Sequence, residues 1–540
     1  MRVCFCQSSK AASFLSLPAV NTPSSATCLH TAVSGCSPML GDFWDLSQGH
    51  CLYVLPNGSA RPVNVQVNEA AVVLKFSDGL SEQDTGMRCC CRGKRPDESK
   101  VTKELKIPDL LGVVLDPEKA LLRFVHCPRR SSVRVREDVI LQIQGDSEVL
   151  KQTDKWAKEL SSKCHSMKGP RKYRVFINPA SGSGQAQVKW EIAKELLDQL
   201  PWIQLEELRT THAGQAEEVA EKEVNPESCD GIIVVSGDGM VHEVFNGLSK
   251  RPDAEAALRK LPVGHIPGGS GNALATSINH SAGESFGALE AAFLIAKGKT
   301  QPLDLMTVSQ PSRPLRTSFL SLSGAIISDI DLGSESMRFL GGLRFAVYGV
   351  YCLLNPKPLQ AELTYWPATA STVPGSSPPP IEEALPEGPW VTITDSFNVF
   401  WAINMAWASF DSHLAPGLSM GSGTWKLALL RNASRATLTK FLLNLENGGH
   451  VNLEKAELLE CKAFRLLPQG SSGSRERFSL DGEEVPFEGI QLWPSLGGHV
   501  LGAQPFIQRE NSPHCWTANT SVVPGSGTRL SMFSERTRSL

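Results

Sequence analysis

The sequence predicts an α/β domain followed by an antiparallel β domain, with a smaller β-rich module in front of both. Three observations support this prediction. Strands and helices alternate over residues 172–298, which is typical of a parallel sheet with helical crossovers. After residue 302 the pattern changes to short strand-like runs at the spacing of an antiparallel sandwich. Short β-rich runs separated by polar turns also fill residues 51–136.

Length and composition restrict the class of protein. A chain of 540 residues, 41% of them hydrophobic, can bury several cores, so we expect about two to four domains. The net charge of −3 argues against a general nucleic-acid-binding protein. The 14 cysteines lack the spacing of a metal site, which favours a reduced intracellular protein. No apolar run reaches the roughly 18 residues of a membrane-spanning helix.

Domain bounds follow from the changes in composition. We expect a β-rich module, an α/β domain and a β domain at residues 46–168, 171–300 and 301–506. Segments rich in serine, proline or glycine are predicted to be disordered, namely the leader 1–45, the insert 367–388 and the tail 507–540. A cleaved transit peptide is the alternative for the leader.

The module at 46–168 ends in a predicted helix, Ser147–Cys164, that carries Trp156. Strands followed by one amphipathic helix are compatible with a pleckstrin-homology-like (PH-like) module. Two basic clusters, at residues 88–95 and 129–136, would suit an anionic membrane surface. Ordinary solvated charge is the alternative for both clusters.

Three glycine-containing turns follow three predicted strands of the α/β domain. They are residues 181–184, 236–239 and 267–272, and the second follows the β-branched run 232–235. Because the carboxyl ends of parallel strands meet at one edge of a sheet, the turns bring backbone N–H groups and helix amino ends to that edge. The sequence therefore predicts a nucleotide-binding site there. Ordinary strand turns are the alternative.

The motifs at these turns resemble those of the diacylglycerol-kinase-type catalytic domain, and most closely those of sphingosine kinases. They are NPASGSG (178–184), VSGDGMVHEVFNGL (235–248) and IPGGSGNALA (266–275). SDIDLGSESMRFLGGLRF (328–345) and SLDGEE (479–484) are similar to later parts of the same family, so the resemblance covers about residues 171–505. It implies an NAD-kinase/diacylglycerol-kinase-like α/β catalytic domain followed by an antiparallel β-sandwich that binds lipid.

The resemblance assigns the chemistry at the second turn to Asp238, which lies between two glycines at the predicted start of a helix. Asp238 would be the general base that takes the proton from the primary hydroxyl of the lipid. A carboxylate that only stabilises the amino end of the helix is the alternative. The residues that the resemblance places around ATP are Asn178, Pro179, Ala180, Gly182, Gly184, Thr210, Thr211, Gly214, Gly237, Gly239, Glu243, Gly269, Ser270, Gly271, Arg338, Arg344, Asp481, Gly482 and Glu483.

Two of these residues, Arg338 and Arg344, are six positions apart, which a regular helix would place on different faces. Gly341 and Gly342 between them would interrupt the helix and let both guanidinium groups converge on phosphate groups.

Asp331 and Ser236 are the predicted contacts of the lipid. In sphingosine kinases the aspartate that matches Asp331 receives the ammonium of the long-chain base, a charge-assisted bond worth roughly 1.5–3 kcal/mol. A diacylglycerol or a ceramide offers no such cation. A surface carboxylate is the alternative for Asp331.

The sequence as a whole predicts an ATP- and Mg²⁺-dependent kinase that transfers the γ-phosphate to the primary hydroxyl of a sphingoid base, sphingosine or sphinganine. No direct protein ligand of the metal is predicted. A diacylglycerol or ceramide kinase of the same family is one alternative. A weakly active membrane-binding regulatory protein is another, supported by the neutral Ala180, Ser183 and Gln185 at the first turn. We expect a cytoplasmic protein that associates peripherally with a membrane, and targeting to an organelle by the leader is the alternative.

Overall fold

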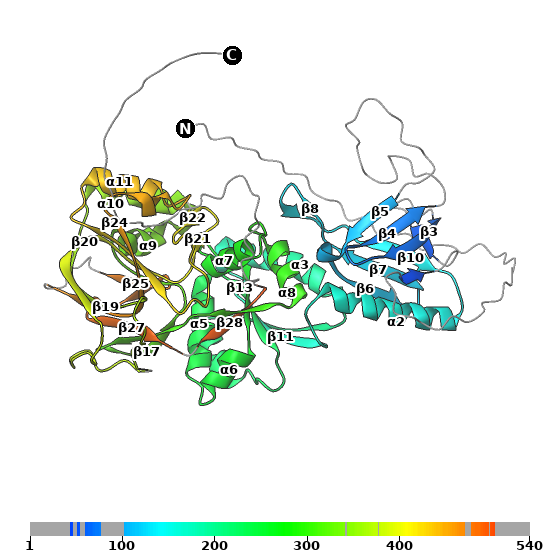
Figure 1. The fold of residues 1–540 in the computed structure, drawn as a ribbon, viewed down its shortest axis with the longest axis horizontal. Helices are drawn as coiled ribbons and strands as arrows, with labels where there is room; N and C mark the ends of the chain where they lie inside the picture. The colour runs from blue at the N-terminus through cyan, green and yellow to red at the C-terminus, as the bar shows by residue number, and fades with distance from the viewer. Residues whose placement is uncertain are drawn as a thin grey trace, which may run out of the picture. The chain divides into compact units, whose positions relative to one another are not determined.

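The computed structural model of the chain describes residues 44–46, 51–54, 60–76, 102–340, 343–375, 377–469, 477–495 and 497–502. All of them belong to one compact unit, Trp44–Leu540. Three large β-sheets and the helices packed on them make up this part of the chain (Figure 1). The predicted tail, the basic cluster at 88–95 and all but the last two residues of the predicted leader lie outside the described residues.

The amino-terminal module is an antiparallel sheet of eight strands followed by one helix. Its order is β5-β4-β3-β2-β10-β7-β6, and β1 pairs with β3. The helix α2 (Ser147–Cys164) begins at Asp146, whose side chain accepts two backbone hydrogen bonds, and it packs Trp156 into the core of the sheet. The strands are β1 (Trp44–Leu46), β2 (Cys51–Val54), β3 (Ala60–Val67), β4 (Ala71–Phe76), β5 (Thr102–Lys106), β6 (Leu110–Asp116), β7 (Leu121–His126) and β10 (Val139–Ile143).

The second sheet has the order β12-β11-β13-β14-β28-β15. The pairs from β12 to β14 are parallel, as the alternating pattern predicted. Every residue of the β-branched strand β13 is buried, as expected for a parallel strand covered on both faces. The strands are β11 (Arg171–Ile177), β12 (Ile203–Arg209), β13 (Gly231–Ser236), β14 (Val263–Pro267), β15 (Thr300–Leu303) and β28 (Gly498–Leu501).

Six helices belong to this α/β region: α3 (Gln185–Leu197), α4 (Gln215–Lys222), α5 (Asp238–Ser249), α6 (Ala254–Lys260), α7 (Ala273–Ser281) and α8 (Ala288–Lys297). Strand β28 comes from the far end of the described chain and pairs with both β14 and β15. The chain thus returns to the α/β sheet after the β domain. The expected bounds, 171–300 and 301–506, assigned the residues of β28 to the β domain.

The third sheet contains ten strands that pair antiparallel, as predicted for the β domain. Strand β19 pairs with β20 and β24, and β23 pairs with the same two strands, so these four strands close a ring within one hydrogen-bonded sheet. The strands are β16 (Met306–Gln310), β17 (Arg313–Ser318), β18 (Ser321–Ala325), β19 (Leu359–Pro367), β20 (Val391–Ile403), β23 (Trp425–Arg431), β24 (Ala456–Pro468), β25 (Phe478–Leu480), β26 (Glu483–Val485) and β27 (Ile490–Pro494).

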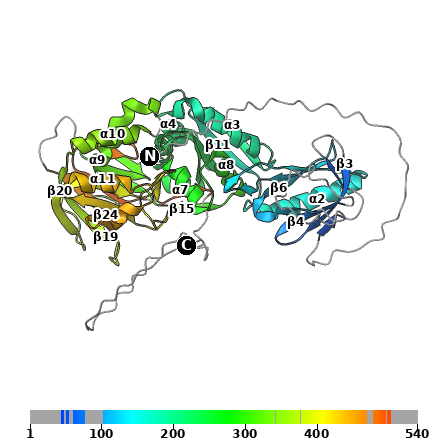
Figure 2. The ribbon, with the colours of Figure 1, turned by 90° about the horizontal axis from the view of Figure 1, so that it is seen from above.

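Three helices pack on β20 and β23 around a shared apolar core (Figure 2). They are α9 (Ile326–Gly333), α10 (Leu343–Leu354) and α11 (Arg435–Leu443). A short hairpin, β21 (Trp407–Ser409) and β22 (Ser412–His413), follows β20. In the part of the chain that the structure describes, no helix combines the length and the apolar character that crossing a bilayer requires.

The insert at 367–388, for which disorder was predicted, is described except at residue 376. Side chains of the β domain donate hydrogen bonds to its backbone carbonyls. The Trp366 indole N–H donates to Thr372 O over 3.1 Å, and Arg465 Nη1 donates to Glu383 O over 2.7 Å. These buried donors would lose their partners if the insert left the surface.

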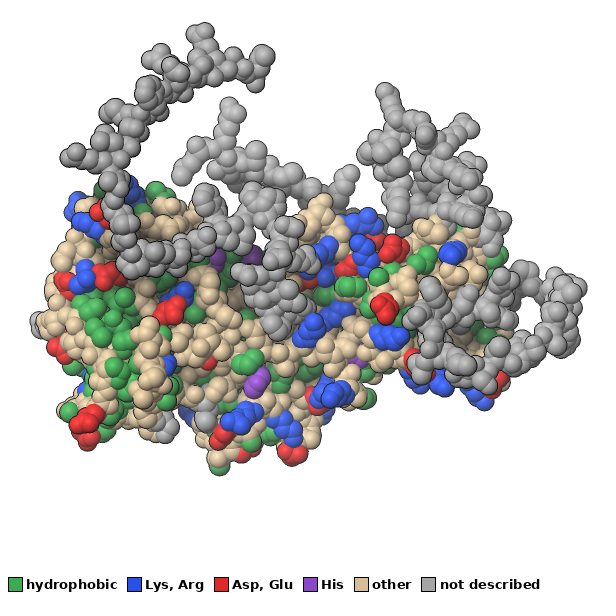
Figure 3. Space-filling view, in the orientation of Figure 1, with side chains coloured by type: hydrophobic (Ala, Val, Ile, Leu, Met, Phe, Trp, Pro, Cys, Tyr) green, Lys and Arg blue, Asp and Glu red, His purple; other side chains and the backbone are tan. Residues whose placement is uncertain are grey.

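The arginines at 129–136 are all paired with carboxylates, so they do not form a free basic surface. Arg134 is buried and binds Glu284 of the α/β region, as does Arg129, and these contacts join the module to that region. The remaining pairs are Arg130 with Glu137, and Arg136 with Asp138 and Glu195. Basic and acidic side chains are likewise interspersed on the face drawn in Figure 3. The predicted use of this cluster at a membrane is therefore not supported.

Candidate active site

The three glycine turns meet at the carboxyl ends of β11, β13 and β14, as predicted. Gly268 N–H donates to Ser236 O over 2.9 Å, and Asp238 N–H donates to Gly271 O over 3.2 Å, so the second and third turns are hydrogen-bonded to each other. The Ser236 hydroxyl donates to the Ser181 hydroxyl over 3.2 Å and connects the first turn. One edge of the sheet thus carries all three turns.

Glycine is required where these turns touch. A Cβ on Gly182 would lie 2.3 Å from Gly268 O, and Gly182 also has a φ of 58°. A Cβ on Gly269 would lie 2.3 Å from the Cα of Gly237. Any side chain at these positions would push the turns apart and open the edge of the sheet.

Asp238 is the first residue of α5, and only 7% of it is exposed. Its carboxylate accepts a hydrogen bond from Ala273 N–H over 2.7 Å and one from Leu274 N–H over 3.1 Å, in the first turn of α7. Burial raises the pKa of Asp238 to about 6; the two backbone N–H groups oppose this shift and the charge of Asp481 adds to it. The carboxylate therefore contacts the amino end of α7 and has a raised proton affinity.

The remaining predicted nucleotide residues of the α/β region lie at the same edge. Residues 178–180 follow β11, and Asn178 Oδ1 accepts a hydrogen bond from Ala180 N–H over 3.1 Å. Thr210 and Thr211 follow the neighbouring strand β12, and Thr210 N–H donates to Ile177 O over 2.9 Å. Gly184 and Gly214 precede α3 and α4 with left-handed backbones.

Asp481 brings a hairpin of the β domain to this edge. Its carboxylate is 1% exposed and accepts four hydrogen bonds over 2.7–3.0 Å, while His242 Nδ1 of α5 lies 2.9 Å from it. The four donors are the Ser318 hydroxyl and the N–H groups of Phe319, Leu320 and Ser321. Because its oxygens are occupied, Asp481 positions the hairpin, and this geometry does not favour the predicted contact of its carboxylate with the nucleotide. Through Gly482 the hairpin places Glu483 Oε1 3.1 Å from where a Cβ on Gly239 would lie.

Asp331 lies on α9 beside the same hairpin. Its Oδ2 accepts a hydrogen bond from the Ser479 hydroxyl over 2.6 Å. Burial raises the pKa of Asp331, Ser479 and Arg344 oppose that shift, and the charges of Glu335 and Glu483 add to it. Asp331 is thus a partly buried carboxylate within electrostatic range of the hairpin.

Arg344 is 4% exposed and pairs with Glu335 over 2.5 Å. The side chain of Arg338 and the two glycines at 341–342 lie outside the described residues. Convergence of both arginines on the nucleotide therefore stays a prediction.

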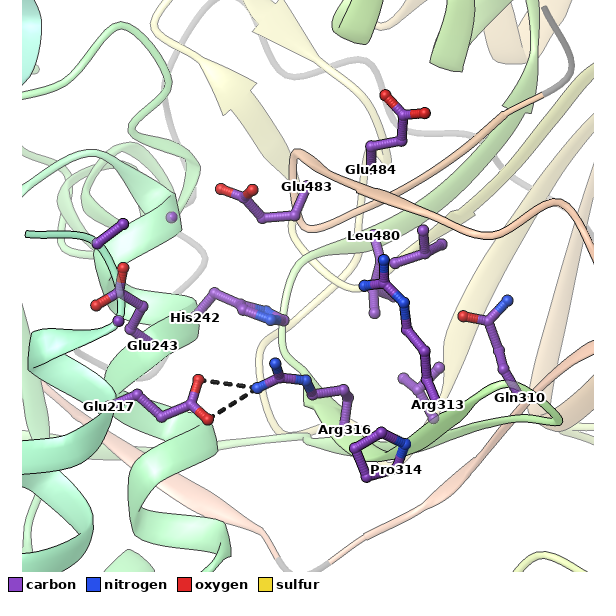
Figure 4. A pocket seen from close by; sticks show the side chains of 15 residues that line it. Glu217, His242, Glu243, Gln310, Arg313, Pro314, Arg316, Leu480, Glu483 and Glu484 are labelled. Atoms are coloured by element: carbon purple, nitrogen blue, oxygen red, sulfur yellow. Dashed lines mark hydrogen bonds and ion pairs between the residues drawn. The ribbon is translucent and has the colours of Figure 1, made fainter. Parts of the chain in front are cut away.

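A pocket of about 280 Å³ lies between α4, α5 and the β domain (Figure 4). Four predicted nucleotide residues line it: Gly214, Gly239, Glu243 and Glu483. His242 and Glu243 enter it from α5, and Gln310 and Arg313 from the opposite side. Arg316 borders it and donates to both oxygens of Glu217 over 2.9 and 2.8 Å, which holds β17 against α4.

Comparison with known proteins identifies the family of the chain. The family model described as the diacylglycerol kinase catalytic domain matches residues 172–308. Sphingosine kinase 1 of Rattus norvegicus is 32% identical over 343 residues, which are 60% of this chain and 88% of that protein. The chain belongs to the sphingosine kinase family.

Sphingosine kinase 1 of Arabidopsis thaliana is 28% identical to the chain over 398 residues, which are 69% of this chain and 81% of that protein. A solved structure of a diacylglycerol kinase from Bacillus anthracis str. Sterne covers 63% of this chain and 100% of its own, with 15% identity and a TM-score of 0.42.

Sequence reasoning missed one buried histidine of this sphingosine kinase family member. His265 Nε2 donates to Ser236 O over 2.9 Å, and Nδ1 accepts from Ala275 N–H over 3.2 Å, so the ring ties the second turn to α7. Burial lowers the pKa of His265 to about 4, which keeps the ring neutral. The only signal in the sequence was a polar residue inside the buried strand 263–266.

Proposed function

We propose that the protein transfers the γ-phosphate of ATP to the primary hydroxyl of a sphingoid base such as sphingosine or sphinganine. The observation that carries this proposal is the position of Asp238, which is buried at the edge where three glycine turns meet. Asp331 of α9, which accepts a hydrogen bond from Ser479 of the neighbouring hairpin, supports it. Membership of the sphingosine kinase family supports the same reaction. Asp238 would take the proton of the hydroxyl as it attacks, and Asp331 would receive the ammonium of the base.

The nucleotide would lie over the three turns, where backbone N–H groups and the amino ends of α3, α5 and α7 favour negative charge. Mg²⁺ would enter with it. Among the described residues no three His, Cys, Asp or Glu side chains gather as a metal site. Mg²⁺ usually binds through substrate phosphates, water and one or two carboxylates, so Glu483 at the pocket fits such a site without forming a cage. Bound Mg²⁺ would neutralise charge on the phosphates.

The rest of the chain would serve the lipid and the membrane. We propose the division at 46–168, 171–300 and 301–506, with β28 added to the α/β part. The antiparallel part would be the sandwich-type lipid-binding domain, because α9, which packs on the apolar core of that part through Ile326 and Ile327, also carries Asp331. The order of the module's strands and the helix after its last strand support a PH-like module. Peripheral membrane association in the cytoplasm completes the proposal, without a basic surface at 129–136.

Kinase activity is expected to decrease below about pH 6. The proton acceptor must be ionised, and burial raises the pKa of Asp238 to about 6, so protonation removes the base as pH falls through that value. Below it, kcat/KM should fall about tenfold per pH unit. Initial rates with sphingosine and saturating ATP from pH 5 to 8 measure this profile. A level profile down to pH 5 would contradict the assignment.

Asp331→Asn is expected to raise KM for sphingosine by about 10- to 100-fold, because a charge-assisted bond to the ammonium worth roughly 1.5–3 kcal/mol would be lost. KM for an N-acetylated sphingosine, which has no cation, should change little. Asp329→Asn, two positions earlier on α9, is the matched control and should leave KM unchanged. Equal losses on both lipids would argue for a neutral lipid substrate such as diacylglycerol or ceramide. No transfer by the wild-type chain would favour the regulatory protein.

A further inference from the structure

Helix α7 connects the proposed base to the β domain. Its first turn holds the carboxylate of Asp238 through the N–H groups of Ala273 and Leu274, over 2.7 and 3.1 Å. Its last turn carries His280, and Ser277 lies between the two ends. Any movement of α7 would therefore displace the two hydrogen bonds that Asp238 accepts.

Trp407 of β21 packs against the second half of this helix. Its ring lies flat between His280 of α7 and His413 of β22, with ring centroids 4.1 Å apart on both sides and interplanar angles of 7° and 3°. Trp407 N–H also donates to the Ser277 hydroxyl over 3.3 Å. One residue of the β domain thus contacts α7 through a stacked ring and through its backbone.

The hairpin that carries Trp407 is itself held in place. Leu414 N–H donates to Ala406 O over 2.8 Å and closes the hairpin. His413 N–H donates to Leu445 O over 2.9 Å, and His450 Nε2 donates to Leu414 O over 2.9 Å, so the hairpin is bonded to the segment after α11. These hydrogen bonds therefore hold Trp407 in place where it contacts α7.

We propose that Trp407 is a positioning residue for phosphate transfer: by fixing α7 against the β domain, it keeps the N–H groups of Ala273 and Leu274 on the carboxylate of Asp238. The proposal rests on the proposed function, since it takes Asp238 as the base. It also gives the β domain a second role besides the binding of lipid, which is to position α7 for the proton transfer at Asp238.

The expected effect is a change in the proton affinity of Asp238. Hydrogen bonds from N–H groups favour the ionised carboxylate, so weakening them raises its pKa. The titratable groups that face Asp238 are His265, whose Nδ1 lies 3.9 Å away, and Asp481. His280 and His413 face Trp407, and His450 lies near His413. Burial lowers the pKa of all three histidines, that of His413 to about 4.

The test compares Trp407→Ala with Trp407→Phe in the full chain. Trp407→Ala should move the acid limb of kcat/KM upward by about half to one pH unit, leaving a several-fold loss at pH 6 that disappears at pH 8. Trp407→Phe keeps a ring between the histidines and should restore most of the wild-type profile. Hydrogen exchange followed by mass spectrometry should show faster exchange over residues 273–281 in Trp407→Ala only.

Phe410→Ala is the matched control. Phe410 lies between β21 and β22, is 64% exposed, and stacks on Phe286, beyond the end of α7, with a centroid distance of 5.8 Å. Its removal should change neither the profile nor the exchange of α7.

A wild-type acid limb in Trp407→Ala overturns the proposal. Should that variant not fold, Ser277→Ala decides, with a smaller shift in the same direction expected and an unchanged profile overturning the idea. If the wild-type chain transfers no phosphate to a sphingoid base, the proposed function fails, and the exchange measurement alone judges whether Trp407 fixes α7.

Discussion

Asp238→Asn is expected to lower kcat for transfer to sphingosine by about 10²- to 10⁴-fold, because an amide cannot take the proton of the attacking hydroxyl. The substitution also changes a structural contact. An asparagine has one oxygen for the two N–H groups of Ala273 and Leu274, so its NH₂ group would face a donor. Single-turnover rates with labelled ATP measure the chemical step, and a melting curve measures the accompanying loss of stability.

Asp253→Asn provides the matched control for that experiment. Asp253 precedes α6 and pairs with Arg251 at the surface, so the same carboxylate-to-amide change should leave kcat intact. A residual rate in Asp238→Asn within about tenfold of wild type would mean that another group accepts the proton, and that Asp238 only supports α7.

Asp481→Ala is expected to be among the most destabilising substitutions in the chain, at roughly 3–5 kcal/mol, since it removes a buried carboxylate that accepts four hydrogen bonds. Four donors of the 318–321 segment and His242 would be left facing a cavity. Urea unfolding followed by fluorescence should show a clearly lower midpoint.

Glu484→Ala, three positions further along the same hairpin, is the control for Asp481. Its side chain is 58% exposed and only loosely paired with Arg477, so the free energy of unfolding should change by less than about 0.5 kcal/mol. If Asp481→Ala were instead stable and bound ATP more weakly, the result would support the direct contact between Asp481 and the nucleotide that the sequence predicted.

The turns at the sheet edge were predictable because they depend on local sequence. A buried β-branched run followed by glycines determines where a strand ends, and parallel pairing then brings the turns together. The role of Asp481 was not predictable, because its donors lie about 160 residues earlier and are mostly backbone groups that any residue supplies. The contacts of His265 were missed because both of its partners, Ser236 O and Ala275 N–H, are backbone groups.

Two other expectations depended on composition alone. The insert at 367–388 has the proline and glycine content of a disordered segment, but tryptophan and arginine side chains from the sheet fix its carbonyls. The arginines at 129–136 read as a basic surface until their carboxylate partners, such as Glu284, were placed by the fold. In both cases some of the deciding partners are distant in sequence, such as Arg465 for the insert and Glu284 for the arginines, and composition carries no information about them.

Strand β28 has a consequence for how the protein is made. It lies between β14 and β15 in the nucleotide-binding sheet, yet it spans residues 498–501, beyond the whole β domain. During synthesis the earlier strands of that sheet leave the ribosome long before the strand that joins β15 to them. The sheet can be completed only after the β domain has emerged from the ribosome, and a chain that lacks 498–501 would leave β14 and β15 without the strand that joins them.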